Sequence, residues 1–213
     1  MTSLDPASPE RTGGATKMSN IAKTRNITLI AVFTAIVAVL QFVGATIHFG
    51  TFSISLVLVP IVIGAALCGP YAGAWFGFVF SLIVLFTDSA AFMVINPLGT
   101  ILTVLVKGTL AGYLAGLVYK KASEKNQNRY FSVGLAAVIA PIVNTGVFLI
   151  GCRLFFFETI KAWGAGAGFD NAYVYMLVGF VGINFLLELV INIVLSPVIA
   201  RLIDYGQKSL GRA

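Results

Sequence analysis

Charged residues are scarce in this chain, and so are the residues that build metal and catalytic centres. Only 10% of its 213 residues are charged, against about 25% in a typical soluble domain. It has one histidine and two cysteines, and Cys68 and Cys152 form no CxxC pair, so neither a zinc site nor a redox motif is indicated. We therefore expect no metal, no cofactor and no catalytic residue, and we expect that the protein is not an enzyme.

The sequence also lacks the short motifs of nucleotide-dependent and hydrolytic enzymes. No stretch matches GxxxxGK[ST], HExxH or GxSxG. If the protein moves a solute uphill, the energy must therefore come from an ion gradient or from a partner subunit.

Hydrophobic residues, in contrast, are abundant and lie in long continuous blocks. They make up 58% of the chain, enough for about six helical crossings at roughly 20 residues each. Such blocks do not fit the alternating strands of an outer-membrane barrel. The sequence predicts an all-α, polytopic protein of the plasma membrane with six transmembrane helices. The predicted helical blocks are 27–45, 54–68, 72–86, 100–119, 131–157 and 174–200.

The polar ends of the chain divide it into three predicted segments. Residues 1–25 contain Pro, Ser, Gly and Thr and little apolar surface, which predicts a disordered cytoplasmic tail. Residues 26–205 form the predicted six-helix transmembrane domain. Residues 206–213 form a second, short cytoplasmic tail.

Positive charge is distributed unevenly about this topology. With six crossings, eleven of the fourteen Lys and Arg residues fall on one side of the bilayer. The positive-inside rule assigns that side, and with it both termini, to the cytoplasm. The asymmetry indicates membrane topology, and we expect no nucleic acid as a partner. The eleven residues are Arg11, Lys17, Lys23, Arg25, Lys120, Lys121, Lys125, Arg129, Arg201, Lys208 and Arg212.

Small residues recur every fourth position in three of the blocks. This spacing gathers them on one helical face, where two backbones can approach closely. The pattern is typical of packing within one bundle, and the alternative is docking onto another membrane protein. The residues are Ala31, Ala35, Gly73, Gly77, Gly108, Gly112 and Gly116.

Polar side chains lie at membrane depth in three predicted helices, where they are costly and mark candidate functional sites. Lys107 shares a helical face with Thr100 and Thr103, and Glu188 lies in a polar stripe of the last helix. We predict a cavity in which Lys107 attracts an anionic group. The alternative is a Lys107–Glu188 ion pair that only sets helix register. The predicted substrate-binding residues are Asn96, Lys107, Asn144, Asn184 and Glu188.

Two further residues lie near the predicted outer face. Trp163, in a glycine-rich segment, is either an interfacial anchor or part of a lid over the site. Arg153 is half a turn from Asn144 on a straight helix, so we expect it to reach the lipid headgroups instead of the site.

The order of these features resembles the substrate-binding (S) components of energy-coupling-factor (ECF) vitamin transporters, over roughly residues 24–205. The resemblance is carried by LVLVPIVIGAALCGPYAGAWFGFVFSLI, by NPLGTILTVLVKGTLAGYLAGLVYKK, by the AxxxA of Ala31 and Ala35, and by the Asn and Glu one turn apart in the sixth helix. Within the family, the NPLGT and LVKGT stretches look most like the pantothenate branch.

This resemblance implies a six-helix protein that binds a small vitamin, best matched by pantothenate, from outside. It also implies that the face of Ala31 and Ala35 docks onto a membrane scaffold subunit driven by two cytoplasmic ATPase subunits. The rival interpretation is an autonomous ion-coupled secondary transporter, with Lys107 and Glu188 as its proton relay. We find no internal repeat between residues 26–119 and 131–205, whereas secondary transporters often have one.

Overall fold

The long elements of the computed structural model are all helices. The structure describes residues 9–46, 48–49, 52–53, 56–126 and 128–209, and the side chains of 23–46, 56–126 and 128–208. Its only strands in these ranges are β1 (His48–Phe49) and β2 (Phe52–Ser53), which form a short antiparallel hairpin. The helices are α1 (Pro9–Gly44), α2 (Leu58–Cys68), α3 (Pro70–Thr87), α4 (Ala90–Ile95), α5 (Pro97–Lys125), α6 (Arg129–Phe155), α7 (Phe157–Gly166), α8 (Ala172–Val174), the π-helix η1 (Tyr175–Phe180) and α9 (Gly182–Ser209).

Among the described residues, five helices are long and apolar enough to cross a membrane. They are α3, α5, α6 and the apolar parts of α1 and α9, Lys23–Gly44 and Gly182–Lys208. The remaining apolar block forms α2, which has 11 residues and is mostly buried. The prediction of an all-α, multi-pass membrane protein is confirmed.

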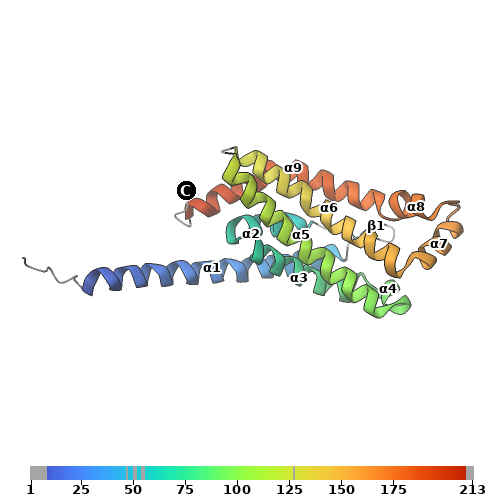
Figure 1. Cartoon of the computed structure of the whole chain (residues 1–213), viewed down its shortest axis with the longest axis horizontal. Coiled ribbons are helices and arrows are strands. Elements are labelled where there is room, and N and C mark those ends of the chain that lie inside the picture. Colours follow the sequence, from blue (N-terminus) through green and yellow to red (C-terminus); the bar gives the residue numbers. More distant parts are fainter. Residues whose placement is uncertain (1–8, 47, 50–51, 54–55, 127, 210–213) are drawn as a thin grey trace, which may run out of the picture.

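The helices form a bundle in which α2 lies between α1 and α9, toward the end where α9 finishes (Figure 1). α5 packs between α3 and α6, and α6 packs against α9. The short α2 contacts α1, α3, α5, α6 and α9, which explains why its apolar residues are buried on almost every side. α1 contacts α2 and α3, and its N-terminal part continues beyond the end of the bundle (Figure 1).

The first and last helices differ from their predicted bounds. α1 begins at Pro9, inside the segment predicted as a disordered tail, and residues 1–8 lie outside the described residues. Once a membrane helix has formed, each further turn costs little, so the helix can extend into a polar segment. The last block is not one helix, because the π-helix η1 precedes α9. α9 continues to Ser209, and residues 210–213 of the predicted second tail are not described.

The predicted glycine pattern packs α3 against α5. A Cβ atom on Gly112 would overlap the carbonyl oxygen of Gly73, and one on Gly77 would overlap that of Gly108. The two helix backbones are therefore in direct contact, as small residues allow in membranes. For these glycines the interpretation as packing within one bundle is confirmed.

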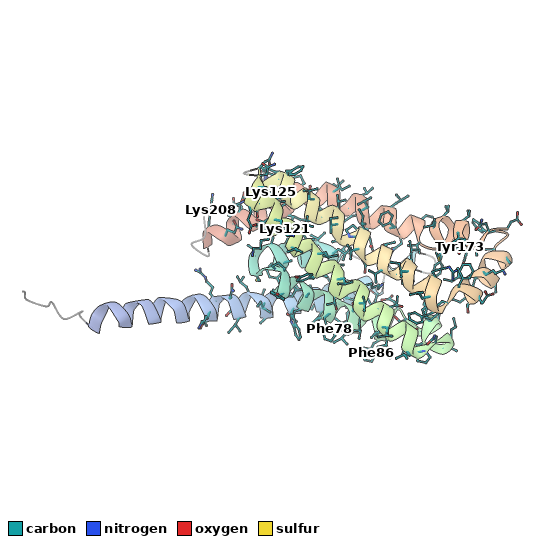
Figure 2. The ribbon with its side chains drawn as sticks, viewed as in Figure 1. Phe78, Phe86, Lys121, Lys125, Tyr173 and Lys208 are labelled. Atoms are coloured by element: carbon teal, nitrogen blue, oxygen red, sulfur yellow. The ribbon has the colours of Figure 1, made fainter. Side chains whose placement is uncertain are left out.

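The two ends of the bundle differ in charge. Lys121, Lys125 and Lys208 lie at the end where α9 finishes, whereas Tyr173 lies at the opposite end (Figure 2). At the lysine-rich end the side chains of Arg129 and Asp204 form an ion pair that joins α6 to α9. The N-terminal part of α1 extends from this same end (Figure 1).

Candidate functional site

A cavity of about 430 Å³ lies between α1, α3, α5, α6 and α9 and is completed by α4, α7 and η1. Its volume is in the range of small-molecule sites. Aromatic rings and polar side chains share its wall. The polar residues that line it are Gln41, Asp88, Ser89, Thr100, Thr103, Lys107, Asn144, Thr145, Asn184 and Glu188, and the aromatic ones are Phe80, Phe92, Phe148, Phe156, Trp163, Tyr175 and Phe180.

Lys107 extends from α5 into this cavity. It lies on the same helix face as Thr100 and Thr103, and all three line the wall, as their spacing predicts. The Nζ atom is 5.1 Å from the ring centroid of Phe148 and 6.0 Å from that of Phe80. The ammonium group therefore rests against aromatic faces, which attract a cation.

Lys107 and Glu188 do not form an ion pair. Both line the cavity, but within the described part of the chain the one ion pair shorter than 4.0 Å joins Arg129 and Asp204. The structure therefore lacks the direct contact on which the alternative, purely structural interpretation of Lys107 rested.

The Glu188 carboxyl group is contacted by polar side chains of its own helix and by Asn144 of α6. The Glu188 side chain is 2% exposed, and its Oε1 atom accepts a hydrogen bond from Nδ2 of Asn184 at 3.2 Å. One turn further on, Nδ2 of Asn192 donates to the backbone oxygen of Glu188 at 2.8 Å. Asn184 and Glu188 line the cavity, whereas Asn192 is fully buried and does not. Within the predicted polar stripe, Asn184 and Glu188 therefore border the cavity, whereas Asn192 forms a hydrogen bond within the helix.

Several buried polar atoms of the cavity wall have no hydrogen-bond partner. They are Oε2 of Glu188, Oδ1 of Asn144 and Oγ1 of Thr103, on side chains no more than 5% exposed. Buried polar atoms are nearly always hydrogen-bonded in native proteins. A ligand or ordered water in the cavity would satisfy them.

Asn96 does not line the cavity. Its Oδ1 atom accepts a hydrogen bond from the backbone N–H of Gly99 at 2.9 Å, which makes it the N-cap of α5. The side chain is thereby used in starting the helix that carries Lys107.

Ala31 and Ala35 lie outside the cavity on an exposed face of α1. In the apolar part of this helix only 17% of the residues are buried, the smallest fraction among the five long helices. The face is therefore open to lipid or to another protein.

Sequence reasoning missed Gln41 and Asp88. Gln41 of α1 is 3% exposed, and its Nε2 atom donates to Oδ2 of Asp88 at 3.0 Å. Both residues line the cavity. The sequence did offer a signal, because Gln41 is a lone amide in an apolar helix and Asp88 is an acid directly after an apolar helix. Neither residue, however, belongs to a repeating polar stripe.

Trp163 lines the cavity. Its ring centroid is 5.8 Å from that of Phe92 and 5.9 Å from that of Phe180, and all three rings line the wall. The side chain therefore faces the cavity, as the lid interpretation requires. Arg153, in contrast, is exposed and donates to the hydroxyl of Tyr173 at 3.0 Å, outside the cavity lining.

Comparison with known proteins identifies a family and a relative of this chain. Residues 25–200 match the family described as ECF transporter, substrate-specific component. The chain is similar to the pantothenic acid transporter PanT of Lactococcus lactis subsp. cremoris, with 29% identity over 196 residues, which cover 84% of this chain and 93% of that protein. No solved structure matches it.

Proposed function

The chain belongs to the family of substrate-specific components of ECF transporters, and from that premise we propose that its cavity binds pantothenate from outside the cell for uptake. The family is a component of transporters and not of enzymes, and the chain is a multi-pass protein of the plasma membrane. The similarity to the pantothenic acid transporter PanT supports pantothenate as the vitamin.

The observation that carries this proposal is the position of Lys107. It is the one cation among the described residues that line the cavity, and no carboxylate lies within ion-pair distance of it. Pantothenate carries a carboxylate at one end, an amide in its middle and two hydroxyls at the other end. The carboxylate would bind the Lys107 ammonium group, a charge-assisted contact that is stronger than a neutral hydrogen bond.

The amide and hydroxyl groups of the ligand would find hydrogen-bond partners in the cavity wall. Asn144 and Asn184 can hydrogen-bond amide or hydroxyl atoms, and both line the cavity together with Lys107 and Glu188. The aromatic rings would cover the dimethyl carbon of the vitamin. Asn96 contributes only indirectly in this arrangement, because it caps α5.

We further propose that residues 26–205 form one domain with six crossings, in which α2 supplies the sixth. This short helix is buried among its neighbours, so it need not match the bilayer thickness by itself. The lysine-rich end of Figure 2 is then the cytoplasmic end, with both termini, and the cavity opens toward the outside. Reporter fusions at the two termini test this topology, and opposite locations would contradict it.

The proposed partners are a membrane scaffold subunit and two cytoplasmic ATPase subunits. The sequence has no ATP-binding motif of its own. The exposed face around Ala31 and Ala35 is the proposed docking surface, because small residues let another helix approach closely.

Mass spectrometry of ligand released from the purified protein tests the substrate directly, and calorimetry with added pantothenate gives its affinity. Biotin, thiamine and riboflavin serve as controls. Tight binding of pantothenate alone supports the proposal, whereas preferential binding of another vitamin contradicts it. Uptake by the purified chain alone, driven by a pH gradient across liposomes, would instead support an autonomous transporter.

A further inference from the structure

Two oxygen atoms of the cavity wall are buried acceptors without a donor. Oε2 of Glu188 and Oδ1 of Asn144 come from α9 and α6, and each belongs to a side chain no more than 5% exposed. Carboxylate and amide oxygens accept hydrogen bonds and cannot donate them. Leaving such atoms unpaired is costly, so the ligand that fits here must supply donors.

The Glu188 carboxylate is already oriented for this task. Its Oε1 atom is occupied by Asn184, and its backbone oxygen is occupied by Asn192. The second oxygen, Oε2, therefore has a fixed direction before any ligand binds. Such preorganisation makes the contact more selective, because little ordering remains to be done on binding.

This pair of acceptors differs in chemistry from Lys107. The ammonium group offers only donors and suits a carboxylate, whereas Glu188 repels a carboxylate and suits a hydroxyl. A molecule with an anion at one end and hydroxyls at the other can satisfy both groups at once. A simple carboxylic acid without hydroxyls would satisfy only Lys107.

We infer that Glu188 and Asn144 determine substrate specificity by accepting hydrogen bonds from the hydroxyl groups of the ligand. The inference rests on the proposed function, which supplies the hydroxyl-bearing anion. The site then takes hydroxylated acid amides and rejects otherwise identical molecules that lack a hydroxyl. This rejection arises because a missing donor leaves a buried oxygen unpaired.

The test compares pantothenate with two analogues in which one or the other hydroxyl is replaced by hydrogen. Calorimetry on the purified full chain gives the dissociation constants, and the quantity of interest is their ratio. A ratio measured on one preparation does not depend on the fraction of folded protein. We expect at least one analogue to bind the unaltered protein about 10- to 100-fold more weakly than pantothenate.

Glu188→Gln and Asn144→Leu remove the acceptors in turn. In Glu188→Gln the amide oxygen would stay with Asn184, and an NH₂ group would replace Oε2, so we expect the ratio to fall to within about threefold of unity. Ser132→Ala is the matched control, because Ser132 is fully buried on the same helix as Asn144 but does not line the cavity. Its ratio should equal that of the unaltered protein.

The outcomes separate the two proposals. If the unaltered protein binds pantothenate and both analogues equally, or if both acceptor variants keep the original ratio, the assignment of Glu188 and Asn144 is wrong and the proposed function stands. If pantothenate does not bind at all, the proposed function fails, and this inference is overturned with it.

Discussion

Two faces of α5 differ in how closely they are packed. Toward α3, Gly108 and Gly112 leave no room for a single additional carbon atom. Toward α6 and α9, Thr103 and Lys107 border a cavity of about 430 Å³. One helix therefore has a face in direct backbone contact with α3 and another face that borders the cavity.

This difference separates the contacts that stabilise the bundle from the polar groups that line its cavity. Close backbone packing supplies dispersion contacts, the main source of helix association in lipid. Polar groups around a cavity provide no such gain and are costly at membrane depth. The α3–α5 contact thus fixes the position of the helix that carries Lys107, as the proposed binding site requires.

The largest effect is expected in the tight contact. Gly112→Leu would force α3 and α5 apart, and we expect a loss of about 3 kcal/mol of stability, seen as a lower melting temperature in detergent. Gly146→Leu on α6 is the matched control, because no atom lies within 4 Å of a Cβ there. Equal melting temperatures for the two variants would contradict the role of the glycine contact.

The next effect is expected in the cavity. Lys107→Met removes the charge at similar length, and the loss of a charged hydrogen bond of about 1.5–3 kcal/mol predicts a 10- to 150-fold weaker affinity for pantothenate. Calorimetry gives the affinity, and the melting temperature checks the fold.

A double variant separates this role from a structural one. If Lys107 only neutralises Glu188, then Lys107→Met combined with Glu188→Gln should restore both folded yield and affinity. Near-native affinity in the double variant would return Lys107 to a structural role.

A smaller effect is expected on the exposed face of α1 around Ala31 and Ala35, which lies outside both the α3–α5 contact and the cavity. Ala31→Leu and Ala35→Leu add bulk to an exposed helix face, so we expect docking to weaken by about 1–2 kcal/mol. Uptake in cells should fall while the isolated protein still binds pantothenate. Val194→Leu, at an exposed position of α9, is the control. A parallel loss of ligand binding would show that the alanine face packs the bundle instead.

The smallest effect is expected where the polar face of α5 begins. Asn96→Ala removes the N-cap of the helix, which typically costs about 1 kcal/mol of stability. Because Asn96 does not line the cavity, the affinity for pantothenate should change less than twofold. A large drop in affinity at an unchanged melting temperature would return Asn96 to the binding site.

Periodicity within single helices predicted much of the site. The spacing of Thr100, Thr103 and Lys107 placed them on one face, and the structure brings that face together with Asn144, Asn184 and Glu188. Such predictions succeed because a helix fixes the relative direction of its own side chains. Gln41 and Asp88 were missed because their importance arises from a contact across 47 residues, which no local pattern records.

The sequence alone determined the membrane class, the apolar blocks, the charge asymmetry and the faces of each helix, because these follow from composition and from the 3.6-residue period. Only the tertiary structure decided which faces meet. It assigned the glycines to the α3–α5 contact, made Asn96 a helix cap, left Lys107 without an ion pair to Glu188, and left two buried oxygens without a hydrogen bond. The reason is physical: packing and hydrogen bonding depend on the distance between segments that are far apart in the chain.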